Sequence, residues 1–146
     1  MSRLDTHVGY WIRCASSQVS HALSRKLERK GVTLAEWIVL RELYEGARRP
    51  SALAHALGLT RGTISKLAAR LVANLMITQQ ASGADGRAQM LALTDLGRTT
   101  VRVLAVLVDD NEEEFFGDLE PGTRALIVAT LREIVRRRGS RATPAG

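Results

Sequence analysis

The chain has 146 residues, enough for one domain of ordinary size with a substantial apolar core. It carries 21 lysines and arginines against 15 aspartates and glutamates. The segment 48–102 holds eight of the bases and two of the acids, so it accounts for the whole net charge of +6. Such a concentration of positive charge favours a polyanionic partner.

Patterns typical of catalysis, metal binding and secretion are lacking. One cysteine cannot form an internal disulfide framework, and the three histidines are scattered without metal-ligand spacing. No phosphate-binding glycine loop or nucleophile elbow is present. No apolar segment resembles a signal peptide or a membrane span. We therefore expect a cytoplasmic protein that is not an enzyme, with no cofactor, no metal and no membrane contact.

The N-terminal part of the chain predicts two helices. Apolar residues recur at steps of three and four from Thr6 to Lys30, the pattern of a long amphipathic helix that Gly31 would end. At 1.5 Å per residue it spans roughly 36 Å, too long for one small module to cover, so we expect it to pack on a partner chain. Thr33 and Glu36 form a capping box that would start a second helix, buried centrally and ending near Glu45.

A helix-turn-helix is predicted between Ser51 and Leu75. Ala54 is small where two helices would cross, Gly58 lies at the turn, and Thr60 can cap the second helix. The other face of that helix is polar and basic, and no acid occurs from Leu59 to Ala84. Such a face suits the major groove of DNA, although an amphipathic hairpin with a solvated basic face would give the same pattern.

A β-hairpin is predicted to follow. Met76–Gln80 and Gln89–Leu93 have the composition of strands, and small residues connect them around Asp85 and Gly86. Arg87 would lie near the tip, where an arginine fits the narrow minor groove of DNA. As an isolated feature it could equally be one more surface arginine.

The C-terminal part predicts two further helices and a disordered tail. Thr94 would cap a helix from Asp95 to about Phe116, whose acidic end at 109–114 we expect to be a solvated face. Pro121 would open the last helix, which runs to Arg138 and leaves residues 139–146 disordered. The residues expected along the inner side of the first of these helices are Leu96, Val103, Leu104, Leu107 and Val108.

This order of elements resembles the MarR family of winged-helix transcription regulators over nearly the whole chain. Asp85-Gly86-Arg87 followed by Leu91-Ala92-Leu93-Thr94-Asp95-Leu96-Gly97-Arg98 is similar to the wing signature of that family. The resemblance implies a mainly α fold with a small β-hairpin wing (α+β). It implies one domain, 1–138, with a DNA-binding winged helix-turn-helix at about 33–98 and dimerisation helices at about 5–30 and 99–138.

The resemblance also implies a function and its residues. The expected protein is a homodimer that binds a palindromic operator in double-stranded DNA, and most relatives are repressors released by a small aromatic or phenolic ligand. Asp85 would orient the wing. The residues expected to contact DNA are Ser51, Thr60, Arg61, Gly62, Thr63, Ser65, Lys66, Arg70 and Arg87.

Two positions depart from the family pattern. Leu75 stands where a glycine usually follows the recognition helix, which suggests a different exit from that helix. Gln80 stands where an arginine usually ends the first wing strand, so one contact to phosphate or within the wing is removed. These departures motivate an alternative function, a dimer that engages a protein partner through its modified wing.

The trigger for release would be a ligand bound between the dimerisation helices and the winged module, in a pocket lined by the first two helices. The two tryptophans and their neighbours form a candidate ligand pocket, although such residues also pack in cores and dimer interfaces. Cys14 offers another alternative, a regulator that responds to thiol oxidation, against the simpler interpretation of an inert small side chain. The candidate pocket residues are Tyr10, Trp11, Cys14, Trp37 and Arg41.

Overall fold

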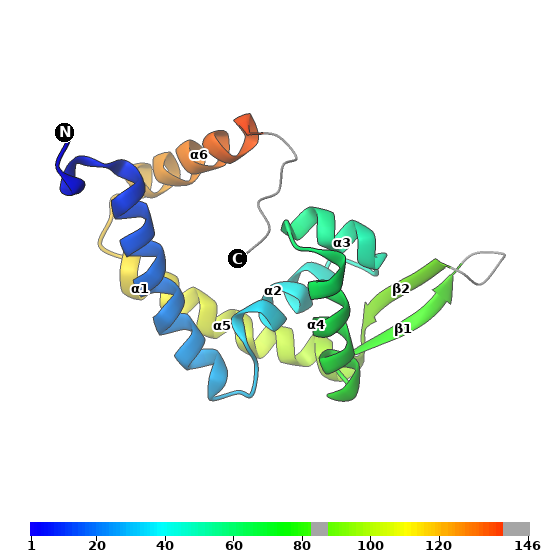
Figure 1. Cartoon of the computed structure of the whole chain (residues 1–146). Coiled ribbons are helices and arrows are strands. Elements are labelled where there is room, and N and C mark those ends of the chain that lie inside the picture. The colour runs from blue at the N-terminus through cyan, green and yellow to red at the C-terminus, as the bar shows by residue number, and fades with distance from the viewer. Residues whose placement is uncertain (83–87, 139–146) are drawn as a thin grey trace.

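The computed structural model describes residues 1–82 and 88–138. These residues form mainly helices and one antiparallel hairpin, as the sequence predicts (Figure 1). A short 3-10 turn, Leu4–Thr6, precedes the first α-helix. The other elements are α1 (Val8–Glu28), α2 (Leu34–Leu43), α3 (Pro50–Leu57), α4 (Arg61–Ala73), β1 (Ile77–Ser82), β2 (Ala88–Leu93), α5 (Asp95–Phe116) and α6 (Pro121–Arg137).

The elements gather at two ends of an elongated molecule. Helices α2, α3 and α4 pack together with the hairpin at one end, and α5 runs from the hairpin to the other end, where α1 and α6 lie (Figure 1). One apolar core contains residues from each of the helices α1, α2, α3, α4 and α5 and from both strands. Its fully buried aliphatic side chains are Leu27, Val39, Leu40, Leu43, Leu53, Ile64, Leu71, Ile77, Leu91 and Leu104.

Helix α1 ends, and helix α2 begins, close to the predicted positions. Gly31, two residues after the C-cap of α1, has a φ of 74°, which glycine adopts without strain. The hydroxyl of Thr33 accepts a hydrogen bond of 3.1 Å from the Glu36 amide, so the predicted capping box is confirmed. The Glu36 carboxylate, however, accepts from the Thr33 hydroxyl at 3.1 Å, where the sequence suggested the Thr33 backbone amide.

The predicted helix-turn-helix is confirmed as α3, a tight turn and α4. Gly58 ends α3 with a φ of 66°, and the Leu59 amide donates to the Ala54 carbonyl at 2.9 Å. This is the left-handed helix cap for which glycine is the favoured residue. The Thr60 hydroxyl then accepts from the Thr63 amide at 3.1 Å, so Thr60 caps α4 as predicted.

The hairpin contains an interaction that the sequence did not reveal. Its strands pair from Ile77 opposite Leu93 to Ser82 opposite Ala88. Arg48, two residues before the start of α3, forms a β-bridge on the other side of β2, with reciprocal backbone hydrogen bonds to Leu91 of 3.0 and 2.8 Å. The segment before α3 therefore ties the base of the hairpin to the helix-turn-helix.

The exit from α4 corrects the expectation for Leu75. Its φ is 63°, the one positive value at a non-glycine residue in the described part of the chain, so it adopts the left-handed conformation that glycine would provide. The Thr94 hydroxyl lies 2.6 Å from the Leu75 carbonyl oxygen and also caps α5. A Cβ on Gly97 would clash with the Met76 carbonyl oxygen, so only glycine permits this approach. The backbone at the end of α4 therefore has the conformation of a glycine turn, although the residue is leucine.

Helix α5 differs from the prediction on its inner side. Leu96 and Val103, expected there, are about half exposed, and Val101 takes an inner position instead. The acidic residues at 109–114 are exposed, as predicted, whereas Asn111 among them is buried. Its amide donates to the Val19 carbonyl at 3.2 Å and its oxygen accepts from Lys26 at 2.7 Å, which links α5 to α1.

Helix α6 contributes no buried residue to the described structure. Six of its apolar side chains are exposed to a large extent: Leu126, Ile127, Val128, Leu131, Ile134 and Val135. No helix in the described part of the chain is both long and apolar enough to cross a membrane.

Candidate nucleic-acid interface

Helix α4 has one face in the core and the opposite face in solvent. Ile64, Leu67, Ala68 and Leu71 are buried against the rest of the module. The i, i+3, i+4, i+7 spacing of these four residues is that of one helix face, which forces the intervening polar residues outward. The exposed residues on α4 include six of the predicted DNA contacts: Arg61, Gly62, Thr63, Ser65, Lys66 and Arg70.

The N-terminus of α4 is open to an approaching anion. Thr60 and Thr63 are exposed, and their hydroxyl oxygens lie 2.8 Å apart. A Cβ on Gly62 would meet no atom nearer than the Thr60 hydroxyl, at 4.0 Å, so the fold itself does not require glycine there. The free amides and the dipole of a helix N-terminus attract phosphate, and a residue without a side chain lets a backbone come close.

The three cations on α4 differ in their partners. Within residues 1–82 and 88–138, Arg61 and Lys66 have no acidic partner, whereas Arg70 forms an ion pair of 2.9 Å with Glu36. The Glu36 side chain is 3% exposed and comes from the first turn of α2. From the sequence, Glu36 is predictable as a capping residue alone, because no local pattern indicates that α4 crosses that turn.

The remaining predicted contacts lie on α3 and the hairpin. Ser51 is exposed in the first turn of α3. Gln80 is exposed on β1 and is paired with Met90 on β2. Arg87 and Asp85, predicted for the wing tip and for wing orientation, lie outside the described residues.

A cluster of arginines surrounds Tyr44 where α2 meets α5. The Arg98 guanidinium stacks over the ring at 4.9 Å and that of Arg41 at 5.6 Å. Arg102 donates to the phenol oxygen at 3.1 Å, and this hydrogen bond lowers the pKa of Tyr44 below its usual range. Arg41 also pairs with Glu45 at 2.8 Å, so its polar and cation–π contacts lie in this cluster.

The candidate pocket residues are only partly brought together. The rings of Tyr10 and Trp11 meet edge to face at 5.2 Å, and Tyr10 and Cys14 line one shallow cavity of about 500 Å³. A hydrogen bond with Cys14 raises the pKa of Tyr10. Trp37, in contrast, is 7% exposed and packs in the core. Within one chain these residues therefore do not line a common cavity among those described.

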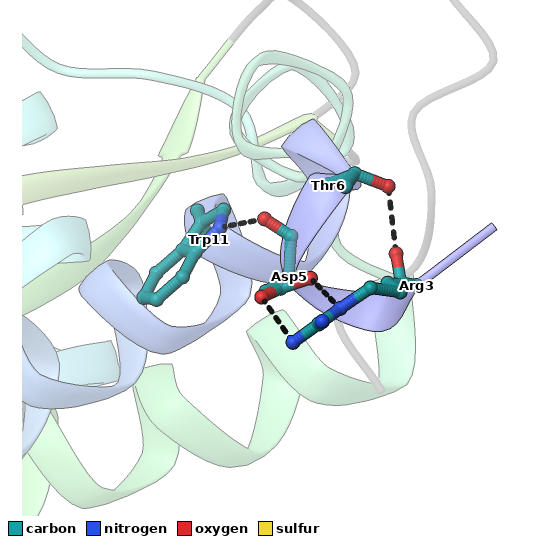
Figure 2. A network of polar contacts seen from close by, with 4 residues as sticks. All are labelled: Arg3, Asp5, Thr6 and Trp11. Carbon is teal, nitrogen blue, oxygen red and sulfur yellow. Dashed lines mark hydrogen bonds and ion pairs between the residues drawn. The ribbon is translucent and has the colours of Figure 1, made fainter.

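The N-terminal turn holds Trp11 in place (Figure 2). The indole nitrogen donates to the Asp5 carbonyl oxygen at 2.8 Å, and Arg3 pairs with the Asp5 carboxylate at 3.2 Å (Figure 2). Trp11 remains 55% exposed and faces an apolar groove of about 560 Å³ between α1 and α6. The other residues lining the groove are Val8, Ile12, Ala15, Ser16, Val19, Glu112, Phe116, Ile127 and Leu131.

The described residues offer no metal centre. No group of three or more histidine, cysteine, aspartate or glutamate side chains in this part of the chain could hold a metal ion. The exposed face of α4 offers hydrogen bonding and positive charge, and a hairpin follows the helix. This arrangement defines the winged helix-turn-helix class of DNA-binding proteins.

Comparison with known proteins finds a family match over part of the chain. Residues 30–88, from just after α1 to the first residue of β2, match the family model described as MarR family. This segment, which contains the helix-turn-helix, is similar to winged-helix transcriptional regulators of that family. A search of curated proteins found no significant match.

Solved structures share the fold over most of the chain. BpsR of Bordetella bronchiseptica, whose DNA binding is regulated by 6-hydroxynicotinic acid, has 24% identity and a TM-score of 0.85, over 93% of this chain and 98% of that one. CouR of Rhodococcus jostii, bound to p-coumaroyl-CoA, has 20% identity and a TM-score of 0.85 over 93% and 96%. A MarR mutant of E. coli in complex with operator DNA has 21% identity and a TM-score of 0.79 over 87% and 92%.

Proposed function

We propose that this protein is a homodimeric repressor that binds a palindromic operator, with α4 in the major groove and the hairpin at the adjacent minor groove. The observation that carries the proposal is the exposed face of α4, which is polar, basic and free of acidic residues. Side chains such as Arg61 can read base edges, while Lys66 and the amides at the α4 N-terminus contact phosphates. Ser51, Thr60, Gly62, Thr63, Ser65, Arg70 and Arg87 complete the proposed interface.

The proposed dimer rests on the apolar surface of α1 and α6. A soluble monomer rarely exposes a contiguous apolar surface of this extent, and a second copy of the chain would cover it. Residues 5–30 and 99–138 would then form the dimerisation region, and residues 33–98 the DNA-binding region. A two-fold axis would place the two α4 helices about one turn of DNA, 34–36 Å, apart.

We further propose that a small aromatic or phenolic ligand releases the DNA. The support is the partly exposed Tyr10 and Trp11 on α1, next to cavities that a partner chain could complete. BpsR and CouR, which share the fold, are described with an aromatic acid and an aromatic thioester. Titrating the protein with aromatic acids and phenols while recording tryptophan fluorescence tests this part, because Trp11 is accessible and Trp37 is buried. An unchanged spectrum and unchanged DNA binding would exclude such ligands.

The alternative trigger, oxidation of the Cys14 thiol, can be tested directly. It lines the same cavity as Tyr10 and Arg13. If oxidation is the trigger, peroxide weakens DNA binding by the wild-type protein and leaves Cys14→Ser unaffected. If both proteins respond alike, Cys14 is not the sensor.

DNA binding itself is tested with a duplex that the wild-type protein selects from a random pool. Fluorescence anisotropy at several salt concentrations gives the affinity and its salt slope. Lys66→Ala should lower the slope by about one unit, whereas Arg61→Ala should cost about 1–3 kcal/mol at one operator position. Arg132→Ala, on α6, is the control and should leave both unchanged. Failure to select any sequence at low salt would refute the proposed function.

A further inference from the structure

We propose that Glu36 is a positioning residue for DNA binding, which holds Arg70 in the conformation that contacts a backbone phosphate. The inference rests on the proposed function and adds a residue that itself never touches DNA. It follows from a single contact between two elements, the first turn of α2 and the last turn of α4.

The contact combines a buried acid with an exposed base. Nη2 of Arg70 lies 2.9 Å from Oε1 of Glu36, and the Thr33 hydroxyl donates to the same oxygen at 3.1 Å. The Glu36 side chain is 3% exposed, while that of Arg70 is 61% exposed. The carboxylate is therefore held in place by its surroundings, and the guanidinium reaches it from the solvent side.

The capping role of residue 36 does not require a charge. Glutamine serves as well as glutamate at the third position of a capping box, and burying a carboxylate is costly unless it is paired. Within the described residues, the Glu36 carboxylate forms an ion pair with one cation, the guanidinium of Arg70. Ordering that arginine is therefore the property that distinguishes glutamate from glutamine at this position.

An ordered guanidinium is a better phosphate ligand than a free one. Arginine has five N–H donors in a planar fork, so the nitrogen bound to Glu36 leaves the others for a phosphate. A long exposed side chain otherwise loses rotamer freedom when DNA immobilises it. Arg70 lies with Lys66 on the exposed face of α4 and its side chain is 61% exposed, so its free donors are accessible to a phosphate at the proposed DNA surface.

The test is a double-mutant cycle on full-length protein with the selected duplex, using wild type, Glu36→Gln, Arg70→Ala and the double variant. Glu36→Gln should weaken binding about two- to tenfold, the cost of ordering one free side chain, with an unchanged salt slope. Arg70→Ala should lower the slope by about one unit. In the Arg70→Ala background, Glu36→Gln should have no further effect on affinity.

The controls separate positioning from a structural role. Circular dichroism and thermal unfolding show whether each variant is folded, and Lys66→Ala replaces Arg70→Ala in a second cycle, where the effects should add. Additive effects of Glu36→Gln and Arg70→Ala would overturn the inference, because a structural defect acts whether or not Arg70 is present. Tighter binding by Glu36→Gln would also overturn it, since Glu36 would then compete with phosphate. If the wild-type protein does not bind DNA at all, the proposed function itself is refuted.

Discussion

At Leu75 the backbone takes a conformation that leucine tolerates at a cost. A left-handed φ brings the Cβ of an ordinary residue too close to the backbone, which costs roughly 1–2 kcal/mol. The side chain offsets little of this, because it is 69% exposed. The hydrogen bonds around it, from Thr94 and Met76, maintain the turn in spite of the leucine.

Leu75→Gly should therefore stabilise the protein. Relief of the left-handed strain exceeds the added freedom of glycine in the unfolded chain, so we expect a gain of about 1 kcal/mol and a rise in Tm of roughly 2–4 °C. Thermal unfolding followed by circular dichroism measures it. Leu75→Ala removes the side chain but keeps the strain, and it should show no such gain. Equal stabilisation by both variants would mean that the exposed side chain, and not the backbone, is responsible.

The two tyrosines have opposite shifts, which predicts two separate ionisation steps. The hydrogen bond from Arg102 lowers the pKa of Tyr44, and the hydrogen bond with Cys14 raises that of Tyr10. Absorbance of tyrosinate during an alkaline titration should show Tyr44 ionising first. Arg102→Ala should move the first step to higher pH, and Cys14→Ala should move the second to lower pH. A single unresolved step in the wild-type protein would contradict both assignments.

At the scale of elements, a polar link joins α1 to α5 inside an otherwise apolar contact. Asn111 bridges the Val19 carbonyl and the Lys26 ammonium group, and Lys26 also pairs with Glu114. Polar partners with directional bonds set the register of two helices more sharply than aliphatic side chains do. This link positions α1 along α5, and thus the groove that α1 forms with α6.

Asn111→Ala should destabilise the protein by about 1–3 kcal/mol. The substitution removes two hydrogen bonds of the buried Asn111 side chain, the one its amide donates to the Val19 carbonyl and the one its oxygen accepts from Lys26. Urea unfolding followed by circular dichroism measures the loss. Asp110→Ala, at the exposed neighbouring position, is the matched control and should change stability by less than about 0.5 kcal/mol. If Asp110→Ala lowers the free energy of unfolding by as much, the effect belongs to helix α5 in general and not to the hydrogen bonds of Asn111.

The two ends of the whole molecule differ in how far one chain buries their apolar side chains. The winged module forms an apolar core within one chain, whereas the groove between α1 and α6 remains open. The long helix predicted to need a partner buries only Leu23 and Leu27 near its C-terminal end. The apolar residues of its N-terminal half are left for the proposed dimer.

Leu131→Asp should dissociate the proposed dimer. Leu131 lines the groove, and an unpaired carboxylate buried by a second copy costs about 3 kcal/mol or more, at least a hundredfold in the dissociation constant. Analytical ultracentrifugation across a concentration series measures this. Leu75→Asp introduces the same charge at an exposed leucine outside the groove and should leave the assembly intact. A wild-type protein that sediments as a monomer would refute the dimer itself.

Local signals in the sequence predicted the helices and, within a few residues, their ends. Periodicity, the caps at Thr33, Thr60 and Thr94, and the glycines at 31 and 58 predicted the helices, and each is confirmed. These signals are local, because a cap or a turn involves residues within a few positions of one another. The exposed face of α4 was predictable for the same reason.

Only the tertiary structure decided how the elements meet. Glu36 with Arg70, Arg48 with Leu91 and Asn111 with Val19 join residues far apart in the chain, and no local pattern distinguishes such partners from solvated side chains. Leu75 shows the same limit in the backbone, where tertiary hydrogen bonds override the preference of the residue. Local preferences are worth a fraction of a kcal/mol to about 2 kcal/mol per residue, and packing and buried polar contacts of similar size select among them.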